Sequence, residues 1–189
     1  MKPQIAIYDA CVLYPAPLRD TLVQLAFSGL VLARWTDTIH EEWISNLLDD
    51  RPDLTRDPLE RTGDKMNLVI EDSLVSGHES LIDGLELPDP GDRHVLAAAI
   101  HCEAQVIVTT NTKDFPNSVL GQYDIEKRRP DAFIAELFSV EPLRVLQALK
   151  AQRERLRNPA QDQDSFLATL QRQGLSTTVS LLTPWKTML

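Results

Sequence analysis

The feature that constrains the fold most is a pair of short apolar segments that each end in polar residues. Residues 4–8 read QIAIY and are followed by Asp9, and residues 105–110 read QVIVTT. Segments of this length that are apolar on both faces are typical of strands buried in a parallel sheet and covered by helices. The chain is therefore expected to be an α/β protein with a central parallel sheet.

Apolar residues at helical spacing occupy the segments between these two strands. Ile39, Trp43 and Leu47 recur every four residues, which predicts a helix over 36–50. Further helices are expected over 18–29 and 59–75, and another begins at the sequence Asp89-Pro90-Gly91-Asp92, where Asp89 caps and Pro90 takes the first helical position. Residues 76–88 are interpreted as a turn, a short strand and a loop.

The chain changes character near residue 140. Leu143, Leu146 and Leu149 begin a long amphipathic helix, which Asn158-Pro159 ends, and a second helix and a last apolar segment follow. The sequence therefore predicts an α/β domain over 1–140 and an α-helical C-terminal extension over 141–189.

Composition limits the kind of protein this is. The 189 residues are 43% hydrophobic and 25% charged, which is ordinary for a globular protein in water. No apolar run is long enough to span a bilayer, and Asp9 interrupts the apolar start, so no signal peptide is expected. Cys11 and Cys102 are too few for a disulfide framework or a zinc site. Free thiols in a reducing cytoplasm are the expectation.

The net charge restricts how the chain meets nucleic acid. It carries 19 basic and 28 acidic residues, a net charge of −9, whereas proteins that bind nucleic acid through phosphates alone are normally basic. Either the protein ignores nucleic acid, or its acids gather in a site that needs cations. In the second case, the densest basic stretches are RNA-binding candidates, with a solvated helix face as the alternative. They contain Lys127, Arg128, Arg129, Lys150, Arg153, Arg155 and Arg157.

Four acidic residues from separated segments are placed to converge. Asp9 follows the first strand and Asp114 lies in the polar segment after the second. Asp92 lies in the first turn of the helix before the second strand, and Glu42 lies beside the buried stripe of the helix over 36–50. Parallel sheets bind ligands beyond the carboxyl ends of their strands, so we expect these carboxylates to meet at one edge.

Such a meeting of carboxylates has a chemical consequence. Carboxylates that lie close together repel one another and do not all ionise cheaply unless a cation is present. Mg²⁺ or Mn²⁺, which prefer oxygen ligands, resolve the conflict, orient water, lower its pKa and neutralise phosphoryl oxygens. The expected reaction is metal-assisted hydrolysis of a phosphodiester.

Each acid also has an ordinary structural explanation. Asp89 is an N-cap, Asp92 suits the positive end of a helix, Glu42 has a solvated acidic neighbour in Glu41, and Asp114 is typical of a turn. Asp9 is the hardest to explain in this way, because the end of a buried strand is poorly solvated.

Taken together, four segments resemble a known family. IYDACVL (7–13), TDTIHEEWISNLL (36–48), LPDPGDRHVLAAAI (87–100) and VIVTTNTKDFP (106–116) occur in the order found in PIN-domain ribonucleases, especially VapC-like toxins of bacterial toxin–antitoxin pairs. The resemblance covers about residues 4–140. It implies a three-layer α/β/α fold around a parallel sheet and a ribonuclease that depends on Mg²⁺ or Mn²⁺. Some longer toxin-type relatives carry a C-terminal helical extension like the one predicted here.

The resemblance also assigns roles to the acids. It implies that Asp9 and Asp92 are the primary metal ligands and that Glu42 positions or deprotonates the attacking water. Asp89 matches an acid often found before the third motif, where it is a direct ligand or supports one.

The fourth acidic position departs from the family pattern. Many relatives carry an acid where this chain has Asn111, so Asp114 is the expected carboxylate and Asn111 an auxiliary oxygen donor. Thr110 is expected to orient a water or a phosphate.

The family further implies partners, and two alternatives stay open. A cognate antitoxin that blocks the acidic crevice and a homodimer are both expected from the resemblance. One alternative is a PIN-fold interaction module that has lost catalysis. The other is an aspartate-nucleophile phosphatase, although Cys11 stands where that class needs a second aspartate as general acid.

Overall fold

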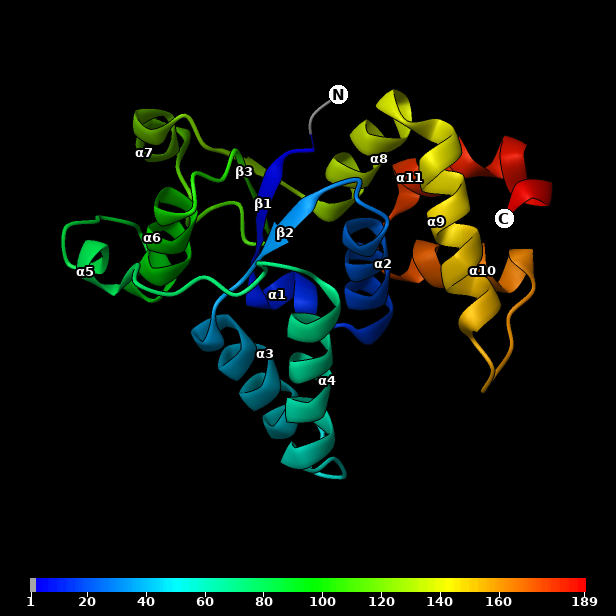
Figure 1. Cartoon of the computed structure of the whole chain (residues 1–189), viewed down its shortest axis with the longest axis horizontal. Coiled ribbons are helices and arrows are strands. Elements are labelled where there is room, and N and C mark those ends of the chain that lie inside the picture. Colours follow the sequence, from blue (N-terminus) through cyan, green and yellow to red (C-terminus); the bar gives the residue numbers. More distant parts are fainter. Residues whose placement is uncertain (1–2) are drawn as a thin grey trace.

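A parallel sheet of four short strands forms the centre of the molecule (Figure 1). The computed structural model describes residues 3–189. The strand order is β2-β1-β3-β4, so the two strands that the sequence predicts most clearly are the inner ones. The parallel sheet confirms the expected α/β fold. The strands are β1 (Ile5–Tyr8), β2 (Leu32–Arg34), β3 (Val106–Val108) and β4 (Glu126–Arg128).

Helices form the connections between the strands, as parallel neighbours require. α2 and α3 agree with the predicted helices to within two residues at each end, whereas α4 begins three residues before the predicted 59–75 and ends six residues before its predicted end. The helices of these connections are α1 (Ala10–Leu13), α2 (Ala16–Phe27), α3 (Asp37–Asp50), α4 (Arg56–Val69), α5 (Glu79–Ile82), α6 (Arg93–His101) and α7 (Asn117–Leu120), with short 3-10 turns at Pro90–Asp92 and Gly121–Tyr123.

The sheet is covered on both faces. The Tyr8 hydroxyl donates a hydrogen bond to the Leu22 carbonyl of α2 at 3.4 Å, and the Tyr8 ring meets Phe133 of α8 (Pro130–Val140) edge to face. α2 and α8 therefore share one face. α6 lies on the other, because parallel crossovers are right-handed and β3 lies on the opposite side of β1 from β2. The layers are those of the predicted α/β/α arrangement.

One sequence-based element is wrong. The short strand expected within residues 76–88 is replaced by the one-turn helix α5, which packs against α6. Extended backbone occurs a few residues earlier instead, where Trp35 donates to the Ser73 carbonyl and accepts from Val75. This short pairing directly follows β2 in the chain, and the segment after it packs onto α6.

The C-terminal helices pack against the α/β part through polar as well as apolar contacts. Arg144 Nη2 donates to the carbonyls of Ser28 and Gly29 just after the end of α2, and Gln152 Nε2 donates to Thr21 Oγ1 in the middle of α2. α9 therefore runs antiparallel to α2 along its length (Figure 1). The division into 1–140 and 141–189 stays a prediction. The helices after α8 are α9 (Pro142–Arg155), α10 (Gln163–Arg172) and α11 (Ser176–Leu182), with a 3-10 turn at Thr183–Met188.

A carboxylate in α8 holds the start of α11. Asp131 accepts hydrogen bonds from the backbone N–H groups of Thr177 and Thr178 at 2.9 and 2.8 Å, and from Thr178 Oγ1 at 2.8 Å. Burial opposes its ionisation, but these hydrogen bonds prevail and lower the pKa of Asp131. Asp131 thus supplies the cap that α11 lacks in its own sequence.

Across residues 3–189, no helix combines the length and the apolar character that crossing a membrane would need.

We expect Asp131→Ala to lower the free energy of unfolding by about 1–2 kcal/mol, as loss of a helix cap does. The pKa of Asp131 is lower in the folded protein than in the unfolded chain. The ionised carboxylate therefore stabilises the fold fully at a pH above the pKa of the unfolded chain, and this stabilisation is lost as the pH falls through the pKa of the folded protein. Urea denaturation at pH 7 and pH 3 measures this. Glu71→Ala, at an exposed carboxylate, is the control, and an equal effect of the two variants at pH 7 would contradict the capping role.

Candidate metal centre

The predicted acids lie at the carboxyl edge of the sheet because of where their segments end. Asp9 follows β1 directly and precedes α1. Asp89 and Asp92 bracket the 3-10 turn that leads into α6, and Asp114 lies in the loop after β3. Glu42 comes from α3. Four separated segments therefore contribute to this edge.

Three of these acids form a compact group. Asp89, Asp92 and Asp114 each offer a carboxylate oxygen, and these oxygens lie within 4.8 Å of one another. Asp89 is exposed, whereas the other two are half-buried. Asp89 Oδ1 also accepts from the Gly91 N–H at 2.8 Å, so the residue is the expected N-cap and a member of the acidic group at once.

The electrostatics of Asp92 show that all five acids are close. Burial raises its pKa, and the negative charges of Asp9, Asp89, Asp114 and Glu42 raise it further, to about 6. Asp9 has the largest effect of these four. Asp92 is thus the point at which the predicted acids meet.

Asp9 is held by neutral groups rather than by a cation. Its residue is 5% exposed, and Oδ2 accepts from Thr109 Oγ1 at 2.6 Å and from Cys11 Sγ at 3.1 Å. Thr109 in turn accepts from the Asn111 N–H at 2.9 Å. Asp9 lies outside the group of three whose oxygens come within 4.8 Å. Sequence reasoning gave Thr109 no role, although its position at the end of the buried β3 segment was visible.

Asn111 and Thr110 lie beside this group. Asn111 Nδ2 donates to Asp92 Oδ2 at 3.2 Å, so the amide nitrogen and not the oxygen faces that carboxylate. Thr110 is exposed, and its backbone N–H donates to Cys11 Sγ at 3.3 Å. The roles predicted for their side-chain oxygens stay predictions.

Glu42 and Glu41 are neighbours with different surroundings. Glu41 is exposed and forms two hydrogen bonds with Arg56 of α4, at 2.8 and 3.0 Å. Glu42 has a 37% exposed side chain, and its Oε1 lies 2.8 Å from Nε2 of the buried His94. Glu41 therefore belongs to a surface ion pair, whereas Glu42 belongs to the acidic group at the edge of the sheet. His94 is a second residue that sequence reasoning left out of the site.

Lys127 points inward and holds the loop that carries Asp114. Its Nζ donates to the carbonyls of Thr112 and Phe115, both at 2.7 Å, and these two carbonyls lie on either side of Asp114 in the chain. The sequence placed Lys127 among the basic residues of an RNA surface. In the structure, its ammonium group instead binds two backbone carbonyls of the loop after β3.

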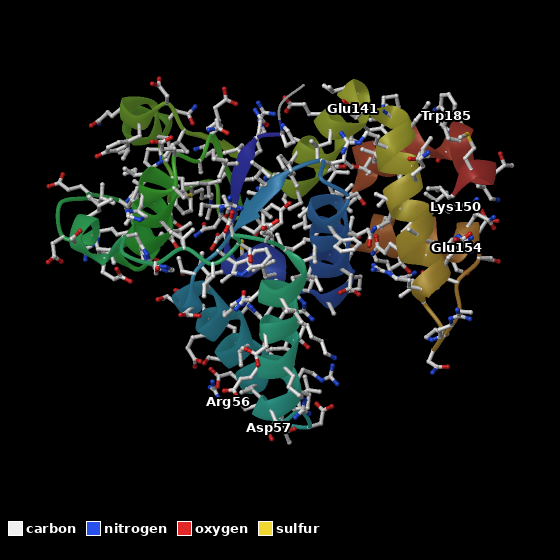
Figure 2. All side chains as sticks on the ribbon, in the orientation of Figure 1. Arg56, Asp57, Glu141, Lys150, Glu154 and Trp185 are labelled. Atoms are coloured by element: carbon white, nitrogen blue, oxygen red, sulfur yellow. The ribbon has the colours of Figure 1, made fainter. Side chains whose placement is uncertain are left out.

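The remaining basic candidates do not gather at the acidic group. Arg128 pairs with Glu126 at 2.7 Å and with Glu136, and Arg153 donates to the Gln161 carbonyl at 3.0 Å. Figure 2 shows Lys150 on α9, and Figure 1 shows α2 and the sheet between α9 and α6. Arg157 is exposed beyond the end of α9, whereas the exposed Arg129 directly follows β4 at the carboxyl edge.

The donor set suits a hard divalent cation. Within residues 3–189, none of the five carboxylates pairs with a lysine or arginine, so their negative charge is not neutralised by the protein. Carboxylate oxygens without thiolate or imidazole ligands are what Mg²⁺ and Mn²⁺ prefer. Burial first, and then the charges of the neighbouring acids, raise the pKa of Asp92, and a bound cation would relieve the repulsion between these charges.

Comparison with known proteins supports the family resemblance through the C-terminal part of the chain, whereas the four motifs lie in the N-terminal part. Residues 130–184 match the family model described as the VapC50 C-terminal domain. A curated relative, "Putative ribonuclease VapC50" of Mycobacterium tuberculosis (strain ATCC 25618 / H37Rv), is 53% identical over 45 residues, which are 24% of this chain and 27% of that protein. The match spans about a quarter of that relative's length. No solved structure matches the chain significantly. The resemblance to VapC-like proteins is thereby confirmed.

We expect Asp92→Asn to stabilise the metal-free protein at pH 7.5 by on the order of 1 kcal/mol, a figure reduced for solvent screening. The folded pKa of about 6 exceeds the unfolded value, so the charged carboxylate destabilises the fold increasingly as the pH rises from about 4 to 6. Urea denaturation at pH 7.5 and pH 4 tests this, and the gain should vanish at pH 4. Mn²⁺ should stabilise the wild type and not the variant. A variant less stable than the wild type at pH 7.5 would contradict the repulsion.

We expect Lys127→Met to weaken Mn²⁺ binding about tenfold, because the loop that carries Asp114 loses both hydrogen bonds that hold it. Calorimetric titration with Mn²⁺ measures the affinity, and circular dichroism checks that the variant is folded. Lys113→Met is the matched control, since Lys113 is exposed and adjacent to Asp114 in the chain. Equal Mn²⁺ affinities for both variants would show that Lys127 does not support the site.

Proposed function

We propose that this VapC-like chain is a divalent-metal-dependent endoribonuclease that hydrolyses RNA phosphodiester bonds and serves as the toxin of a toxin–antitoxin pair. The observation that carries the proposal is the meeting of five carboxylates, without a cationic side chain, around Asp92 at the carboxyl edge of a parallel sheet. The relative's name, a putative ribonuclease, favours RNA as the substrate class.

We propose Asp89, Asp92 and Asp114 as the residues that hold the metal, together with Asp9. Asp9 is the least mobile of them, because burial and the hydrogen bond from Thr109 fix its carboxylate. When bound, Mg²⁺ or Mn²⁺ supplies water of lowered pKa and neutralises charge on the phosphoryl oxygens.

Glu42 is the proposed general base. Its Oε1 lies 2.8 Å from His94 Nε2, which leaves Oε2 to accept a proton from the attacking water. The half-exposed side chain reaches both solvent and the acidic group, as a residue that receives a proton from water must.

The RNA phosphates need cations, and the chain offers them in two places. Arg129 follows β4 at the same edge as the acids and is proposed to contact the RNA near the cut. Lys150, Arg153 and Arg157 belong to the far side of α2, and Arg128 is engaged in ion pairs. If these residues contact RNA, they contact a part of it away from the cut.

The proposal includes the partners that the family implies. A cognate antitoxin that covers the acidic centre would complement its negative charge with a basic side chain, and a homodimer and a cytoplasmic location belong to the same expectation. These follow from the resemblance alone.

A catalytically inactive PIN-fold interaction module is the second candidate. Asn111, an amide where many relatives have an acid, is the observation that favours it. The two candidates differ in whether the protein binds Mn²⁺ and cuts RNA.

We expect the wild type to cleave RNA with Mn²⁺ or Mg²⁺, and Asp9→Asn to lower cleavage about 100-fold, since the substitution keeps the size of the side chain but removes its charge. Cleavage mapping by sequencing of the products, with the two proteins side by side, measures this. Asp57→Asn, on the exposed tip of α4 (Figure 2), is the control and should retain full activity.

Chelation should abolish cleavage, and added Mn²⁺ should restore it. Equal activity of the wild type and Asp9→Asn would show that cleavage does not depend on this acidic site. Absence of both Mn²⁺ binding and cleavage would overturn the nuclease proposal and favour the interaction module.

A further inference from the structure

The proposed general base has a buried partner on another helix. His94 lies in the first turn of α6, and its Nε2 is 2.8 Å from Oε1 of Glu42, which belongs to α3 and lies 52 residues away in the sequence. The residue His94 is 8% exposed. The contact therefore joins α6, whose N-cap is Asp92, to α3, which carries Glu42.

The surroundings of the ring indicate which nitrogen carries the proton. His94 Nδ1 is buried and has no hydrogen-bond partner among the described residues. A proton there would leave a buried donor without an acceptor, whereas a proton on Nε2 points at a carboxylate oxygen. The ring therefore donates from Nε2 to Glu42 and presents only a lone pair at Nδ1.

Glu42 needs such a donor more than an ordinary surface glutamate does. Its negative charge is among those that raise the pKa of Asp92, so Glu42 faces like charge from the acidic group. The hydrogen bond from His94 Nε2 offsets this repulsion at Glu42 Oε1. Glu41, the adjacent residue, shows the alternative, since it turns to the surface and pairs with Arg56.

The other histidines have different environments. His40 accepts from Trp43 Nε1 at 2.9 Å and lies 3.0 Å from Asn67 Oδ1, a packing role between α3 and α4. His78 is buried near Glu79, and His101 is exposed at the end of α6. Within residues 3–189, His94 is thus the histidine that contacts one of the five acids.

We propose that His94 is a positioning residue, whose Nε2–H holds the Glu42 carboxylate toward the acidic group in the orientation that accepts a proton from the attacking water. This inference rests on the proposed ribonuclease function. It assigns His94 no contact with RNA and no part in metal binding, so its effect should fall on turnover.

The first experiment separates turnover from binding. We expect His94→Leu to lower kcat about 10–100-fold for RNA cleavage with Mn²⁺, with KM and the calorimetric Mn²⁺ affinity unchanged. His94→Gln, whose amide can donate from a position near that of Nε2, should recover most of kcat. His101→Leu, on the same helix, is the matched control and should retain full activity. Loss of Mn²⁺ affinity in step with kcat, or failure of glutamine to restore kcat, would overturn the proposal in favour of a packing role.

A double variant tests whether His94 acts through Glu42. If it does, His94→Leu combined with Glu42→Gln should be no slower than Glu42→Gln alone, because the group to be positioned is already gone. A further loss of tenfold or more in the double variant would mean that His94 acts independently of Glu42, which would overturn the proposal.

A spectroscopic measurement distinguishes failure of this inference from failure of the proposed function. Two-bond ¹H–¹⁵N spectra of the histidine rings should show His94 protonated at Nε2, with a shift that changes in Glu42→Gln and not in Glu41→Gln. A ring protonated at Nδ1, or one insensitive to Glu42, would overturn the contact itself. Wild-type protein that shows the contact but cuts no RNA would overturn the nuclease function and, with it, the role of His94 in turnover.

Discussion

Repulsion between carboxylates is the constraint on which the rest of the site depends. The sheet and its loops bring five acids together, and burial together with the charges of the other four acids raises the pKa of Asp92. The groups that hold these acids in place are neutral: a threonine hydroxyl and a thiol on Asp9, an amide on Asp92, and a backbone N–H on Asp89. Neutral donors fix the positions of the oxygens while leaving the negative charge available to a cation. A fold selected for stability alone would neutralise that charge with arginine or lysine.

Several positive charges of the molecule are paired away from this centre. Arg56 pairs with Glu41, and Arg128 pairs with Glu126 and Glu136. Lys127 reaches the site, but its ammonium group binds backbone carbonyls and not the acids. None of these three cations neutralises the acidic edge of a chain whose net charge is −9.

The sequence predicts the elements that show a local pattern of apolar residues. It misses the elements and residues whose conformation or role depends on contacts with distant parts of the chain. β1 and β3 are visible because both of their faces are apolar, whereas β4 reads EKR and is recognisable only once Lys127 and Arg128 are seen to have partners. The segment that forms α5 was misread for the same reason, since its conformation depends on packing against α6. Asp9 stands out by its place after a buried strand. Thr109 and His94 do not, because hydrogen bonds that span 100 and 52 residues leave no periodicity to read.

α8 explains why the match to a C-terminal domain family begins before the predicted boundary. The match starts at residue 130, the first residue of α8, and not at 141. Phe133 on this helix packs against Tyr8 of the central strand, while Asp131 caps α11. The same helix thus completes a layer over the sheet and provides a cap for the extension. The extension therefore depends on α8 for the cap of α11 and on α2 for the surface that α9 covers, while the boundary at residue 140 stays a prediction.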